Sequence, residues 1–99
     1  MNNYQRISSF LIAYFADEWY GVAIRDIRKN TSINPEDWPL IVEIIRNRDL
    51  LPGQPLSLVN HAANQLLYEN SDEEAYFWLD LMVHNVERTD DEIEEYYPR

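Results

Sequence analysis

Residues 71–87, SDEEAYFWLDLMVHNVE, decide the fold of this chain. Ser71 and Glu74 have the spacing of a capping box, in which each side chain accepts a hydrogen bond from the other residue's backbone N–H. Apolar residues then recur every three or four positions, as on the buried face of a helix. These are Ala75, Trp78, Leu79, Met82, Val83 and Val86. The other face carries Glu73, Asp80 and Glu87, so the stretch predicts a helix with one buried and one acidic face.

The same spacing recurs upstream and predicts two more helices before residue 34. The apolar face of the first is made of Ile7, Phe10, Leu11, Tyr14 and Phe15. The second begins after the acidic pair 17–18, ends at the polar residues 30–32, and has a face made of Trp19, Ala23 and Ile27. We expect Phe10, Tyr14 and Trp19 to pack against the helix of residues 71–87, near Trp78 and Met82.

Two further helices are predicted between residues 34 and 70. The sequence Asn34-Pro35-Glu36-Asp37 is typical of a helix start, because asparagine caps, proline suits the first turn, and acids favour the positive end of the helix dipole. This third helix has an apolar face made of Trp38, Ile41, Val42 and Ile45. After a connector at residues 51–55, the fourth buries Val59, Ala62, Ala63, Leu66 and Leu67 and ends at residues 70–71.

The chain as a whole is predicted to be all-α. It has only two glycines, and tight β-hairpin turns depend strongly on glycine. Thr89 and Glu92 repeat the capping pattern, which predicts a short C-terminal helix around Ile93. We therefore expect residues 1–99 to form a single compact domain, a bundle of about five helices with a short helix at its C-terminal end.

Negative charge is concentrated in the C-terminal third. Residues 69–99 hold eleven of the eighteen carboxylates and two basic side chains, Arg88 and Arg99, whereas residues 1–68 are close to neutral. A surface of one sign speeds encounter with a partner of opposite sign. The distribution predicts a basic protein partner and argues against direct binding to nucleic acid or to an anionic membrane. The alternative is that the acids only keep a small domain in solution.

Aromatic residues are interleaved with these acids. They are Tyr68, Tyr76, Phe77, Tyr96 and Tyr97. Tyr76 and Phe77 flank the apolar face of residues 71–87, so not all of these rings fit into the core. Aromatic side chains are favoured as interface anchors, and their faces attract arginine and lysine. They either cover the core or take part in binding.

No pattern in the chain indicates catalysis, a metal or a cofactor. His61 and His84 lie on different predicted helices, and no spacing resembles a zinc site or a calcium-binding loop. The acids of residues 90–95 share one environment, whereas acid–base catalysis needs two contrasting ones. We expect no enzyme activity, no catalytic or metal-binding residue and no cofactor.

The chain is expected to be a cytoplasmic protein. It contains no cysteine, which suits a reducing compartment. Its first residues lack the basic region and cleavage site of a signal peptide. No apolar run approaches the roughly 20 residues that a membrane span needs.

Residues 7–19, ISSFLIAYFADEW, resemble the start of the immunity proteins of contact-dependent growth inhibition, the CdiI family. Members begin with a helix of the form FLxxYF, followed by an acidic residue and a tryptophan. Looser matches are Glu43-Ile44-Ile45, Leu66-Leu67-Tyr68 and Trp78-Leu79. The glycines common before the last helix of the family are replaced here by residues 68–72, and residues 89–99 have no counterpart.

The resemblance implies a helical cytoplasmic protein that binds and neutralises the C-terminal toxin domain of a cognate CdiA effector. Many such toxins are nucleases with basic active sites, which carboxylates and aromatic rings could occlude. The family transfers no site residue, so the candidate toxin-binding residues are chosen on charge and aromatic character. They are Asp72, Glu73, Glu74, Tyr76, Asp80, Glu87, Asp90, Asp91, Glu92, Glu94, Glu95, Tyr96 and Tyr97.

Two alternatives stay open from the sequence. One is an acidic nuclease inhibitor or nucleic-acid mimic unrelated to growth inhibition. The other is a metal-assisted hydrolase that uses the carboxylate cluster.

Overall fold

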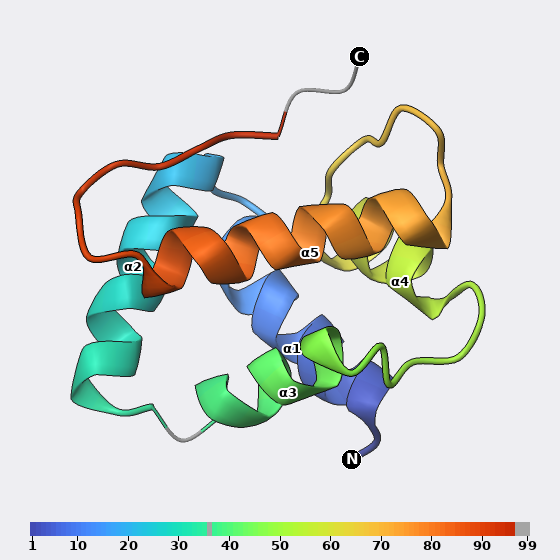
Figure 1. Ribbon diagram of the computed structural model, residues 1–99, viewed down its shortest axis with the longest axis horizontal. Helices are drawn as coiled ribbons and strands as arrows, with labels where there is room; N and C mark the ends of the chain where they lie inside the picture. The colour runs from blue at the N-terminus through green and yellow to red at the C-terminus, as the bar shows by residue number, and fades with distance from the viewer. Residues whose placement is uncertain (36, 97–99) are drawn as a thin grey trace.

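A computed structural model describes residues 1–35 and 37–96, which form an all-α fold without a β-strand. Its elements are α1 (Asn3–Phe15), α2 (Tyr20–Ile33), α3 (Trp38–Arg46), α4 (Gln54–Ser57), the π-helix η1 (Leu58–Ala62) and α5 (Asp72–Glu87). In Figure 1, α5 crosses in front of the other helices, with α2 at one of its ends and α4 at the other. The predicted all-α bundle of five helices is confirmed.

The first helix follows the predicted pattern. Asn2 and Gln5 form a capping box at its start, and Ile7, Leu11 and Phe15 are buried. Phe10 and Tyr14 are only half-buried. Their rings contact each other at 4.9 Å between centroids, and Phe10 contacts Trp38 of α3 at 5.7 Å.

The aromatic contact between the N-terminal helix and α5 is made by other residues than predicted. Phe15 packs edge-on against Trp78 at 5.3 Å, and Tyr20 contacts both rings, at 5.7 and 5.8 Å. Trp19 was expected in this core but is 84% exposed. The reason is that α2 starts one residue later, at Tyr20, so Trp19 is its N-cap and has an extended backbone.

The second helix does not end at the polar residues 30–32, as the sequence predicted, but continues to Ile33. Thr31 and Ser32 donate their hydroxyl hydrogens to backbone carbonyls three residues earlier, on Arg28 and Lys29. This bonding satisfies the hydroxyls within the helix. Asn34 then serves as the C-cap of α2, so it cannot begin the next helix.

The third helix consequently starts later than predicted, at Trp38, with Asp37 as its N-cap. The Trp38 N–H donates to the Pro35 carbonyl at 3.1 Å. Glu36 of the predicted start lies outside the described residues. The predicted buried face is confirmed, with Ile44 added to it: Trp38, Ile41, Val42 and Ile45 are all buried.

The predicted fourth helix is shorter than expected. It is divided into α4 and η1 and ends at Ala62. Asn64, with φ of 56°, adopts the left-handed conformation that terminates helices. Residues 63–71 are therefore an irregular loop, in which Leu67 is buried but Leu66 is 90% exposed.

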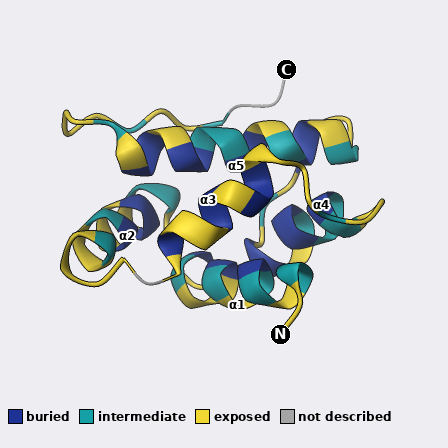
Figure 2. Ribbon diagram, turned by 60° about the horizontal axis from the view of Figure 1, so that its bottom comes forward, coloured by how far each residue is buried: buried dark blue, intermediate teal, exposed yellow. Residues whose placement is uncertain are grey.

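The fifth helix matches its prediction closely. Ser71 is the N-cap and its hydroxyl accepts the Glu74 N–H, while all six residues of the predicted apolar face are buried. Figure 2 shows this buried face turned toward the other helices. The capping box is only half formed, because the Glu74 carboxylate bonds to other residues.

The short helix predicted after Thr89 is absent, and residues 88–96 instead form an irregular segment that we call the strap. In Figure 1 the strap turns back after α5 and runs past α2 along the outside of the bundle. A helix around Ile93 would use the backbone N–H and C=O groups of this segment for its own hydrogen bonds. The backbone N–H and C=O of Glu94 instead bond to the side chain of Asn85.

None of the helices among residues 1–35 and 37–96 combines the length and the apolar character that crossing a membrane requires.

Candidate functional site: an acidic groove beside the strap

A groove of about 610 Å³ opens between the strap, the N-terminal half of α5 and the loop of residues 63–71. We call it the acidic groove. It is lined by Tyr68, Glu69, Glu73, Glu74, Phe77, Leu81, Glu94, Glu95 and Tyr96. Five of these nine residues are acidic and none is basic, so its charge is complementary to a positively charged group.

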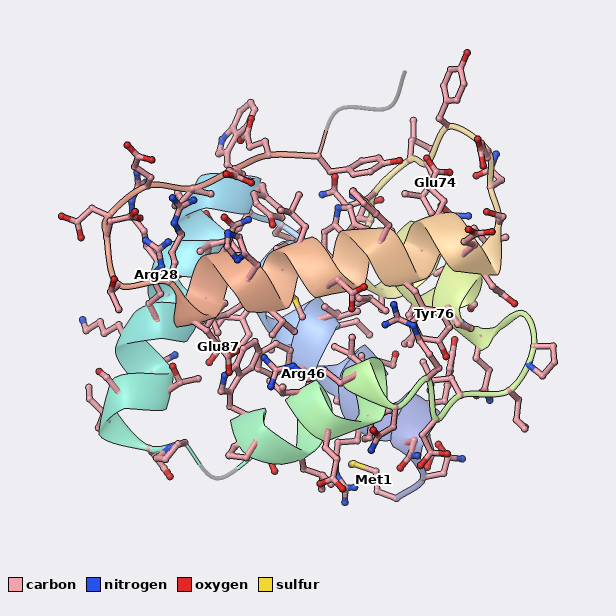
Figure 3. The ribbon with its side chains drawn as sticks, viewed as in Figure 1. Met1, Arg28, Arg46, Glu74, Tyr76 and Glu87 are labelled. Atoms are coloured by element: carbon pink, nitrogen blue, oxygen red, sulfur yellow. The ribbon has the colours of Figure 1, made fainter. Side chains whose placement is uncertain are left out.

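Glu74 is buried and holds the groove together. Its carboxylate accepts the backbone N–H groups of Tyr68, Glu69 and Asn70 at 2.9, 2.6 and 3.1 Å. The hydroxyl of Tyr96 donates to the same carboxylate. Figure 3 shows Glu74 beneath the loop at this end of α5. One side chain thus ties the loop and the strap to α5.

The pKa of Glu74 reflects these contacts. Burial alone would raise it, but hydrogen bonds from Tyr96 and from three backbone N–H groups stabilise the carboxylate and lower the pKa below its usual value. Glu74 is therefore a structural anion rather than a free ligand.

Asn85 and Arg28 fix the rest of the strap. The fully buried Asn85 amide donates to the Glu94 carbonyl at 2.7 Å and to the Tyr20 hydroxyl at 2.8 Å, and its oxygen accepts the Glu94 N–H at 2.8 Å. Arg28, labelled in Figure 3, donates to the carbonyls of Asn85 and Glu92. These bonds position the wall of the groove that Glu94, Glu95 and Tyr96 provide.

The strap's acids are not a free acidic tail. The half-buried Arg88 forms ion pairs with Asp90 at 2.6 Å, Glu92 at 3.3 Å and Glu94 at 3.7 Å. Its hydrogen bond to Asp90 lowers the pKa of that carboxyl. Asp90 and Glu92 are thus partly neutralised within the strap and lie outside the groove lining.

Two exposed aromatic rings border the groove. Tyr68 is 65% exposed and Phe77 is 61% exposed. Phe77 packs edge-on against Tyr96 at 5.8 Å, which supports one side of its ring. An aromatic face beside carboxylates can bind a guanidinium or ammonium group through cation–π attraction and ion pairing together.

The structure brings together five of the predicted site residues and places the others elsewhere. Glu73, Glu74, Glu94, Glu95 and Tyr96 line the acidic groove. Asp91 is exposed on the strap outside it, and Tyr97 lies outside the described residues.

The remaining predicted acids on α5 have structural partners. Asp80 forms a two-bond ion pair with Arg48 at 2.7 and 2.8 Å, and Arg48 also lies over the ring of Tyr76. Glu87 pairs with Arg46 at 2.7 Å, and Figure 3 shows the two facing each other between α3 and α5. Asp72 accepts the N–H groups of Gly53 and Leu56. These contacts join α5 to its neighbours and lower the net charge available to a partner.

Sequence reasoning missed four residues of the groove as site residues: Tyr68, Glu69, Phe77 and Leu81. Phe77 carried a usable signal, since it falls off the buried face of α5. Tyr68 is among the aromatic residues interleaved with the acids, but the predicted fourth helix extended through Tyr68 and Glu69, so no pattern placed them in a loop beside α5.

Tyr96 of the groove and Tyr20, which is bonded to Asn85, are expected to titrate late. Burial, followed by the neighbouring Glu74 carboxylate, raises the pKa of Tyr96 to about 12. Burial likewise raises the pKa of Tyr20 to about 12. In an alkaline titration followed by tyrosinate absorbance, both should ionise well above the ordinary value near 10.

The sign of this effect predicts alkaline unfolding. A phenol whose pKa is raised on folding contributes stability below its unfolded pKa, and that contribution is lost as the pH rises toward 12. Tyr96→Phe should remove one late-titrating phenol. If all tyrosines of the native protein ionised together near 10, the described environment of these two would be wrong.

Within the described ranges, no three histidine or acidic side chains are arranged to hold a metal ion. Searches against protein families, curated proteins and solved structures find no match to the chain.

Proposed function

We propose that the protein is an immunity-type inhibitor that binds a basic toxin domain through the acidic groove. The main support is the lining of the groove. Exposed acids and exposed aromatic rings lie together there, and none of the described lining residues is basic. The resemblance of residues 7–19 to the CdiI family supports the same role and suggests a CdiA toxin as the partner.

The mechanism follows from what the groove can bind. A nuclease must hold phosphates with arginine and lysine side chains, and the same cations are complementary to Glu69, Glu73 and Phe77. When the groove binds these cations, its carboxylates would occupy the positions that substrate phosphates take, so inhibition would be steric and electrostatic. The negative surface would also speed association.

The direct test is co-purification of the tagged protein with the C-terminal domain of the effector encoded beside it, followed by growth protection in cells that express this domain. Binding with protection supports the proposal. A toxin domain that neither co-purifies nor loses toxicity would refute it.

A charge-matched pair of variants locates the interface. Glu69→Gln with Glu73→Gln should weaken toxin binding by about tenfold at low salt, mainly through slower association. Asp26→Asn with Glu43→Gln removes the same charge from exposed positions on α2 and α3, outside the groove, and should change affinity by about twofold at most. Stopped-flow association rates over a salt series measure both. Equal losses in the two variants would mean that overall charge, rather than the groove, attracts the toxin.

A further inference from the structure

Trp19 is 84% exposed, although tryptophan is among the side chains that gain most from burial. Its backbone is nevertheless fixed. As N-cap of α2 it is extended, and its carbonyl accepts the Ala23 N–H at 3.0 Å. The molecule therefore presents a large ring to solvent from a rigid helix start, which is the arrangement of an interface anchor.

Two shallow hollows, of about 240 and 480 Å³, border Trp19. The first contains Glu18 and also Glu95 and Tyr96, which are residues of the acidic groove. The second is lined by Val22, Ile93 and again Glu95, and also by the basic Arg25. The strap residues 95–96 thus separate two aromatic and acidic sites, one at Phe77 and one at Trp19.

We propose that the binding surface continues from the acidic groove across the strap, and that Trp19 receives a second cationic side chain of the same partner. This inference rests on the proposed function and specifies the partner. The partner would present a basic segment that crosses the strap, with one arginine or lysine at Phe77 and another at Trp19. Tryptophan is the best aromatic acceptor for a cation, and Glu18 adds an opposite charge beside it.

Charge decides between this occupant and a second copy of the chain. Each copy carries a net charge of −10, and the face concerned is among its most acidic parts. Two such faces would repel each other, whereas a basic segment is attracted to the acids of the groove and of the first hollow.

The probe is a peptide of alternating glycine and arginine, compared with the same peptide containing neutral citrulline. Trp38 and Trp78 are 7% and 2% exposed, so Trp19 dominates the solvent-sensitive emission. The arginine peptide should change this emission saturably and the citrulline peptide should not. The change should disappear in Trp19→Phe. An equal response to both peptides would overturn the inference.

Calorimetry adds a readout that does not depend on fluorescence. Trp19→Ala should weaken binding of the arginine peptide about three- to fivefold, the effect of one exposed cation–π contact. Ile33→Ala removes an apolar side chain that is 75% exposed at the other end of α2, and should leave affinity unchanged. Both variants should melt as the wild type does, since exposed side chains contribute little to stability. Equal affinity of Trp19→Ala and wild type would overturn the inference.

Failure of this inference is distinguishable from failure of the proposed function. If the toxin binds and the groove variant weakens it, but Trp19→Ala does not, the surface ends at the strap and the proposed function stands. If no toxin binds while the arginine peptide binds through Trp19, the cation-binding surface stands and the proposed partner is wrong.

Discussion

Glu74→Gln is expected to lower the free energy of unfolding by about 3 kcal/mol, although it only exchanges one carboxylate oxygen for an NH₂ group. Hydrogen bonds to a charged acceptor contribute about 1.5–3 kcal/mol each, and a buried donor left without a partner adds a penalty. The carboxylate now accepts hydrogen bonds from the backbone N–H groups of residues 68–70 and from the Tyr96 hydroxyl. The NH₂ group of glutamine would face one or more of these donors and could not accept from them. Thermal and urea unfolding measure the loss, which corresponds to a melting temperature lower by about 10–20 °C.

The pH dependence gives a second check on Glu74. Because its pKa is lowered on folding, its contribution is present above the unfolded value and is lost as the pH falls through the folded value. The wild type should therefore lose stability in acid by more than Glu74→Gln does. Glu73→Gln is the matched control. Glu73 precedes Glu74 on α5 but is exposed, so this substitution should change the free energy of unfolding by about 0.5 kcal/mol at most. Equal effects at the two positions would refute the role given to Glu74.

Asn85→Leu should release the strap and cost about 3 kcal/mol. The side chain is fully buried, and leucine of similar size would leave the Glu94 N–H, the Glu94 carbonyl and the Tyr20 hydroxyl without their partner. Hydrogen exchange at Ile93 and Glu94 should become fast while amides in the middle of α5 stay protected. Toxin binding should also weaken, because release of the strap removes one wall of the acidic groove.

Asn30→Ala is the control for Asn85. Asn30 also donates to a tyrosine hydroxyl, that of Tyr14 at 2.9 Å, but it is exposed. Its loss should cost about 1 kcal/mol or less and leave strap exchange unchanged. Strap amides that stay protected in Asn85→Leu would show that Arg28 and Tyr96 suffice to hold the segment.

The fold was predictable where local signals and tertiary contacts agree. In α5, the Ser71 cap and the apolar face both specify the same helix, and both are confirmed. Where the two compete, the prediction was wrong. Asn34 and Pro35 have the composition of a helix start, but Asn34 is already used as the C-cap of α2.

The candidate site was only partly predictable, because charge does not show which acids have partners. Asp80 and Glu87 are predicted to bind a partner because they lie on the acidic face of the helix, yet Arg48 and Arg46 of a distant segment pair with them. Thr89 and Glu92 have the spacing of a cap, but Asn85 binds the backbone that the helix would need. Such long-range partners leave no pattern in the local sequence.

The position of the strap has a consequence for the timing of function. Arg28, Glu74 and Asn85, which tie the strap to the helices, all precede it in the chain. The buried apolar residues lie between Ile7 and Val86, so the helices can pack before the strap docks on them. The groove acquires its last wall only when the strap has docked. A partner that needs this wall would bind only molecules whose strap is in place.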